Sequence, residues 1–106
     1  MNKGYTVLTD YKQRAVCLTD ERWMHILGHP EMVGQRERVI ETLTELDIVL
    51  ATAKDTAVHT YHRFYKQTPV TQKYLVVAVK ILQGDAYVLT AYFTSQPRRG
   101  DVIWQR

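Results

Sequence analysis

Two histidines, His25 and His29, stand four positions apart in the first third of the chain, and each can exchange protons near neutral pH. In the cleavage of a phosphodiester, His25 would take a proton from the attacking hydroxyl or return one to the leaving oxygen. A single helix histidine is also common as a surface or core residue, so its position alone does not establish this role. The spacing would suit a pair of metal ligands as well. However, Gly28 and Pro30 disrupt it and no third ligand is evident, so we expect no metal site.

The second half of the chain carries the excess of positive charge. Residues 1–45 hold six Lys and Arg against seven Asp and Glu, a net −1, whereas residues 46–106 hold eight against four, a net +4. The same segment interleaves tyrosines and hydroxyls with the cations. This combination suits RNA, because cations meet phosphates and aromatic rings stack on unpaired bases. An ordinary solvated antiparallel sheet has similar residue types, so the composition leaves both interpretations open.

The elements that would position these groups follow from the hydrophobic periodicity. Thr19 and Asp20 are good N-cap residues for a first helix, which Gly28 ends, and Pro30 opens a second helix. From Asp47 the period changes to that of strands. Strands are predicted at 48–52, 58–65, 74–81 and 86–93, with an extended segment at 14–18 and a short apolar segment at 102–104. We therefore predict an α+β fold with N-terminal helices packed on one face of a four-stranded antiparallel β-sheet.

Alternation along each strand assigns its side chains to the two faces of the sheet. Seven residues of the third and fourth strands are expected to face the helices: Leu75, Val77, Val79, Ile81, Leu89, Ala91 and Phe93. The second strand allows two choices for the residues that face away: His59, Tyr61, Arg63 and Tyr65, or Val58, Thr60, His62 and Phe64. Burial of Val58 and Phe64 favours the first choice. The face away from the helices, which we call the open face, would then carry Tyr61, Arg63, Tyr65, Lys80, Thr90 and Tyr92.

Length and composition narrow the class of protein. A chain of 106 residues with 45% hydrophobic and 24% charged residues is expected to fold as a single domain, residues 1–106. Its apolar runs are far shorter than the roughly 18 residues of a membrane span, and no secretory leader is evident, so we expect no membrane association. The single cysteine, Cys17, lies in an apolar run and is expected to be a core thiol of a cytoplasmic protein.

Other motifs add little. No glycine-rich nucleotide loop or hydrolase nucleophile motif is present, and no cofactor is expected. The Arg98-Arg99 pair could hold a phosphate or simply keep an exposed turn soluble, and the solvated turn is the simpler interpretation.

Five segments in order resemble the phage-type BECR nucleases, the superfamily of barnase, EndoU, the tRNA-cleaving colicins and RelE. They are Arg22–Ile26 followed by His29–Glu31, then Tyr61–Arg63, Tyr74–Lys80, Leu89–Tyr92 and Arg99–Trp104. The resemblance extends over about residues 14–104. It implies helices packed on a four-stranded antiparallel sheet. It also implies a metal-independent endoribonuclease, in which a 2′-hydroxyl attacks the adjacent phosphate.

The resemblance also implies a set of site residues. By position, His25 matches the family's helix histidine, and Arg63, Lys80, Thr90 and Tyr92 match its polar sheet positions. We expect His25, Arg63, Thr90 and Tyr92 to be catalytic, and Lys80, Tyr65, Tyr61 and His29 to bind the substrate. His25 or Tyr92 would exchange protons, while Arg63 and Lys80 would stabilise the charge that develops on phosphorus, and Thr90 would bond phosphate or ribose. Unlike barnase, the chain shows no glutamate base on the predicted face, so the general base is open, with His29 in reserve.

Small BECR nucleases are often toxins of type II toxin–antitoxin pairs. The partners implied are therefore an RNA substrate and an antitoxin protein with acidic side chains. The competing hypothesis is a non-catalytic RNA- or protein-binding module of the same fold. An active ribonuclease should be hard to express without its partner, whereas a binding module should express freely.

Overall fold

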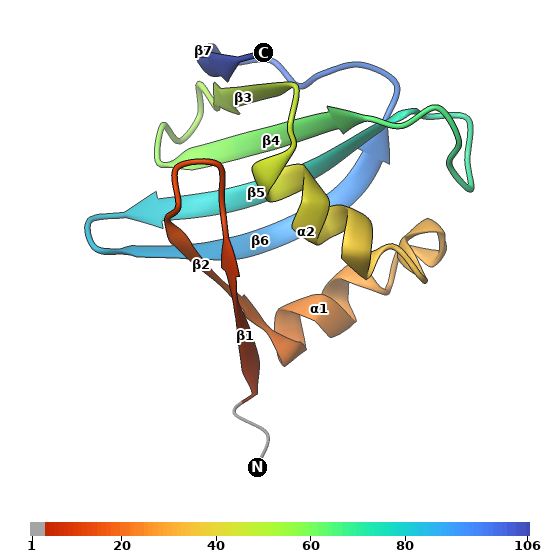
Figure 1. Ribbon diagram of the computed structural model, residues 1–106, viewed down its shortest axis with the longest axis horizontal. Helices are drawn as coiled ribbons and strands as arrows, with labels where there is room; N and C mark the ends of the chain where they lie inside the picture. Colours follow the sequence, from red (N-terminus) through yellow and green to blue (C-terminus); the bar gives the residue numbers. More distant parts are fainter. Residues whose placement is uncertain (1–3) are drawn as a thin grey trace.

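The computed structural model of the protein describes residues 4–106, which build one mixed β-sheet with helical segments packed against it (Figure 1). The sheet has seven strands in the order β1-β2-β6-β5-β4-β3-β7. The strands are β1 (Tyr5–Thr9), β2 (Ala15–Thr19), β3 (Ile48–Ala51), β4 (Val58–Phe64), β5 (Tyr74–Leu82), β6 (Asp85–Thr94) and β7 (Asp101–Gln105). The helical elements are α1 (Asp20–Ile26), the 3-10 helix η1 (Pro30–Met32) and α2 (Arg36–Thr44).

The predicted fold is wrong, because the sheet has seven strands and is mixed. The four predicted strands form its centre as β3 to β6. The β1–β2 hairpin adds two strands beyond β6, where β2 pairs in parallel with β6, and β7 pairs with β3 at the other edge. The outermost strands lack a clear apolar alternation: Leu8 is the one buried residue of β1, and β7 has none. Their pairing therefore depends on the sheet they join.

The helices are short, and local features of the sequence account for where they begin and end. The Thr19 side chain accepts a 3.0 Å hydrogen bond from the Arg22 N–H and caps α1. The second helix predicted from Pro30 is interrupted, because Gly34 adopts a φ of +79° between η1 and α2. Among residues 4–106, no helix is long and apolar enough to cross a membrane.

The core lies between the sheet and the helical segments. Ile26 of α1, together with Val39 and Leu43 of α2, is fully buried in one cluster with Leu75 and Val77 of β5. The helix α1 contacts chiefly β6, and α2 contacts chiefly β5. We call this side of the sheet the helix side.

Strand β4 has the face assignment opposite to the one predicted. Tyr61 bonds the turn of the β1–β2 hairpin and Arg63 bonds α2, so both point to the helix side. His62 and Phe64 therefore lie on the open face. The prediction relied on burial of Val58 and Phe64, but Phe64 is 49% exposed and His62 is fully buried. Burial does not identify the face of β4 that packs on the helices, because part of the open face is covered as well and His62 is buried there.

A register shift between Ala78 and Val79 changes the faces along β6. Val79 lies opposite Val88, whereas Ala78 lies opposite Thr90, so Leu89 is the extra residue of a β-bulge. Val88 is buried in the core. The prediction that Leu89, and not Val88, faces the helices is therefore wrong.

Residues 95–100 connect β6 to β7 and cover part of the open face; we call this segment the strap. Because β7 lies beyond β5, β4 and β3 in the sheet, the strap must pass these strands (Figure 1). Gly100 ends the strap with a φ of +156°, and a Cβ at this position would collide with the Ala51 carbonyl oxygen. A glycine here therefore permits the close approach of the strap to β3.

Candidate functional site

The strap and the loop after β3 line an open cleft of about 480 Å³, which we call the strap cleft. It is lined by Thr52, Ala53, Lys54, Thr94, Ser95, Gln96, Pro97, Arg98 and Arg99. These are cationic, hydroxyl, amide and small apolar side chains, with no carboxylate among them. The cleft is therefore suited to an anion rather than to a hydrophobic ligand.

Three cations line the strap cleft: Lys54, Arg98 and Arg99. The ion pairs found within residues 4–106 involve other residues, so these three charges are not neutralised by a carboxylate there. The Arg98 guanidinium carbon lies 5.9 Å from the centroid of the Tyr92 ring, within the range of a cation–π contact. The positive charge gathered here can be neutralised by a bound anion.

A hydrogen bond to His62 of β4 anchors the strap to the sheet. Its Nε2 accepts a 2.9 Å hydrogen bond from the backbone N–H of Arg98, which places the ring proton on Nδ1. The imidazole is fully buried beside the backbone of Ile48 and Thr60. Burial and the charge of Arg98 lower the pKa of His62, so the ring is neutral at pH 7. His62 is thus a positioning residue for the strap.

Thr90 and Tyr92 lie on the open face, where they were predicted, and Tyr92 lies beside the strap. Tyr92, Val76 and His62 are in register and form one row across β6, β5 and β4. His62 bonds the backbone of Arg98, so this row lies below the strap. Burial raises the pKa of Tyr92, which keeps its phenol protonated at neutral pH.

Lys80 also lies on the open face, as predicted, but it is already paired. Its ammonium group forms an ion pair with Asp55 in the loop after β3. The hydrogen bond from Lys80 lowers the pKa of Asp55, so the carboxylate stays ionised well into the acid range. The arrangement therefore connects β5 to the loop that carries Lys54.

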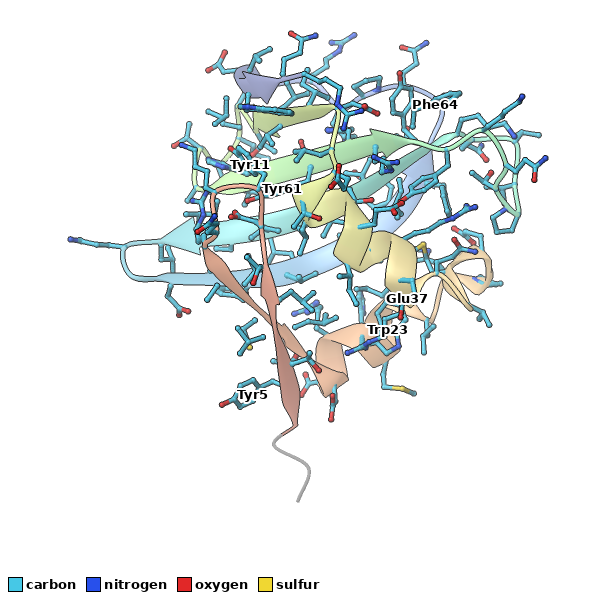
Figure 2. The ribbon with its side chains drawn as sticks, in the orientation of Figure 1. Tyr5, Tyr11, Trp23, Glu37, Tyr61 and Phe64 are labelled. Carbon is cyan, nitrogen blue, oxygen red and sulfur yellow. The ribbon has the colours of Figure 1, made fainter. Side chains whose placement is uncertain are left out.

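An aromatic pair stands at the end of β4, next to the end of β6. The ring centroids of Phe64 and Tyr74 lie 5.5 Å apart with an interplanar angle of 70°. Tyr74 is in register with Thr94, which lines the strap cleft. Figure 2 shows Phe64 at this end of the sheet, well separated from Tyr11 and Tyr61.

The other predicted site residues lie on the helix side, so the structure does not bring the predicted set together. The Tyr61 hydroxyl donates a 2.7 Å hydrogen bond to the buried carboxylate of Asp10, which also accepts bonds from Arg14 and two backbone N–H groups. Burial and this bond raise the pKa of Tyr61 far above its ordinary value. Tyr61 is thus tied to the β1–β2 turn, beside Tyr11 (Figure 2).

Arg63 and Tyr65 are bonded to α2. The Arg63 Nε lies 3.2 Å from Glu41 Oε1, and the Tyr65 hydroxyl donates a 2.6 Å hydrogen bond to the same oxygen. The Arg38 guanidinium carbon lies 4.4 Å from the Tyr65 ring centroid. Burial and the bond to Glu41 raise the pKa of Tyr65 to about 12. These contacts join β4 to α2, and they occupy the side chains of Arg63, predicted to be catalytic, and Tyr65, predicted to bind the substrate.

His25 and His29 are exposed, on α1 and just after it. The helix α1 packs on the helix side, so the sheet separates His25 from Thr90 and Tyr92. The backbone carbonyl of His29 accepts a hydrogen bond from the Met32 N–H at the start of η1. The roles given to both histidines stay predictions.

Sequence reasoning missed His62, Phe64 and Lys54 and treated Arg98 as part of a solvated turn. The alternative face assignment of β4, which was considered and set aside, would have placed His62 and Phe64 on the open face. Nothing in the spacing indicates that the strap brings Arg98 over β4.

Comparison with models of known protein families, with curated proteins and with solved structures gives no match for this chain. The resemblance to BECR nucleases therefore stays a prediction. Within residues 4–106, no group of three or more His, Cys, Asp or Glu side chains is placed to hold a metal ion.

Proposed function

We propose that the protein binds RNA, and that the strap cleft holds the phosphate backbone. The observation that carries this proposal is the presence of Lys54, Arg98 and Arg99 in one cleft with no carboxylate to neutralise them. Cations of this kind gain most from phosphates, because binding releases the counterions that surround a nucleic acid. The hydroxyl groups of Thr94 and Ser95 line the same cleft and suit phosphate or ribose oxygens.

The direct test is fluorescence anisotropy of a labelled short oligoribonucleotide. Arg99→Ala should weaken binding, because Arg99 is exposed in the strap and lines the cleft. The matched control is Lys12→Ala, which removes one exposed cation from the β1–β2 turn on the helix side. Equal losses in both variants would indicate a general effect of charge and would contradict a site at the strap.

A second candidate function is metal-independent RNA cleavage at this cleft, favoured by the contact between Tyr92 and Arg98. Water would accept the proton of the attacking 2′-hydroxyl, and the protonated phenol of Tyr92 would donate a proton to the leaving 5′-oxygen and then regain one from water. The guanidinium of Arg98 would stabilise charge on the phosphorane. Total RNA incubated in EDTA tests this function. Discrete products from the wild type that Tyr92→Phe fails to give would support it, and intact RNA with both would contradict it.

The same proposal includes the cellular location and the protein partner of such a ribonuclease. A cellular RNA substrate and the free thiol of Cys17 favour the cytoplasm. An antitoxin would be a protein whose acidic side chains cover Arg98, Arg99 and Lys54. Co-expression with a candidate acidic partner should then protect the cleft cations from chemical modification.

A further inference from the structure

We infer that Phe64, supported by Tyr74, is a stacking platform for one unpaired nucleobase beside the strap cleft. This inference rests on the proposed function and narrows its ligand to single-stranded RNA. Phosphate contacts alone would hold single strands and duplexes alike, whereas an aromatic ring can stack only on a base that is free of its partner.

The register of the sheet places Phe64 two strands away from Thr94, which lines the strap cleft. Phe64 is in register with Tyr74, and Tyr74 with Thr94, so the three side chains form one row across β4, β5 and β6. Neighbouring strands lie roughly 4.8 Å apart, which puts Phe64 about 10 Å from the residue at which the strap cleft begins. One nucleotide bound in the cleft could therefore have its base, or that of its neighbour, on the ring.

The exposure and orientation of Phe64 suit this role. Its side chain is 49% exposed, although it lies in the middle of the chain and at the end of a central strand. The 70° angle to Tyr74 is an edge-to-face arrangement, which fixes the ring without stacking Tyr74 flat upon it. A single exposed apolar residue is ordinary by itself. The exposed ring becomes informative because it lies in one row with Thr94, which belongs to a cleft that three cations line.

The experiment compares three probes of equal length, about ten nucleotides each. They are a single-stranded oligoribonucleotide, the same strand in an RNA duplex, and an abasic strand that keeps the sugar and phosphates. The variants are Phe64→Ala and Phe64→Trp, with Leu82→Ala as the matched control. Leu82 is 45% exposed at the opposite end of β5 and does not line the strap cleft, so its truncation removes a similar apolar surface far from Phe64.

Phe64→Ala should weaken binding of the single strand about tenfold, the size expected when one stacked base is lost. Binding of the duplex and of the abasic strand should not change in this variant. Phe64→Trp should retain binding of the single strand, because the indole offers a larger face. Leu82→Ala should bind all probes like the wild type.

Two results would overturn the inference, and they differ in what else they imply. If Phe64→Ala binds the single strand like the wild type while Arg99→Ala binds it weakly, the platform is absent but the RNA site at the cleft stands. If the wild type binds no RNA probe, the proposed function fails and the platform fails with it.

Discussion

The backbone N–H of Arg98 donates a 2.9 Å hydrogen bond to Nε2 of His62, and this contact ties the strap to the middle of the sheet. The two residues are 36 positions apart in the sequence. Because His62 is fully buried, its bond is shielded from competing water and fixes where the backbone of Arg98 lies. The position of the strap that carries Arg98 and Arg99 thus depends on a buried, neutral imidazole.

His62→Ala should release the strap. Removal of the imidazole leaves the Arg98 N–H without its acceptor and opens a cavity, at a cost of about 2–4 kcal/mol in the free energy of unfolding. Hydrogen exchange gives a local readout: the Arg98 amide should exchange faster, while the Lys12 amide, bonded to Asp10, should not. Unchanged protection of Arg98 would show that His62 does not anchor the strap.

The free energy of unfolding should decrease as the pH falls below about 6.5. Burial lowers the pKa of both His62 and His59, so the unfolded chain takes up protons there before the folded protein does. The free energy of unfolding should therefore be constant above pH 7.5 and decline as the pH falls from 6.5 towards the folded pKa values. One proton contributes a slope of at most about 1.4 kcal/mol per pH unit.

Urea denaturation between pH 5 and pH 8 measures this slope. His62→Gln and His59→Gln should each flatten the decline, with the larger effect from His62, which is the more buried of the two. A stability profile that is flat across this range in the wild type would contradict the assignment of neutral, buried histidines.

Gly100→Ala should destabilise the fold by about 1–3 kcal/mol and weaken RNA binding together. The added Cβ would meet the Ala51 carbonyl, so the end of the strap must move away from β3. Gln96→Ala, an exposed position in the same strap, is the control for stability and should leave the urea midpoint unchanged. If Gly100→Ala is as stable as the wild type, the strap does not need to approach β3 as closely as it does at Gly100.

Arg63→Ala separates a structural role from the role implied by the resemblance. Arg63 bonds Glu41 and the Glu45 carbonyl at a partly exposed position, so its loss should cost up to about 1 kcal/mol and leave RNA binding intact. Urea denaturation and anisotropy on the same samples give both values. Loss of RNA binding or cleavage with full stability would instead support the site that the resemblance implies.

The central strands could be predicted from the sequence because their apolar residues are concentrated and regularly spaced. The strands β4, β5 and β6 begin and end within a few residues of the predicted bounds. The edge strand β1 could not be predicted, since four of its five side chains are exposed and its pairing depends on β2. The size and the mixed character of the sheet follow from such long-range pairings.

The candidate site could be predicted only in part. Thr90, Tyr92 and Lys80 lie on the open face as expected, because alternation in β5 and β6 follows from clear apolar positions. Tyr61 and Arg63 do not, because β4 buries residues on both faces and the polar groups of its helix side find partners on the hairpin and α2. Alternation alone cannot assign the faces of such a strand.

The most direct test of an RNA site at the strap is the salt dependence of binding to a short single-stranded oligoribonucleotide. Three phosphate contacts predict a slope of about −2 for the logarithm of the binding constant against the logarithm of salt concentration. Arg99→Ala should reduce the steepness by about 0.7, and Lys12→Ala should leave it unchanged. The same slope and affinity in the wild type, Arg99→Ala and Arg98→Ala would contradict binding at the strap cleft.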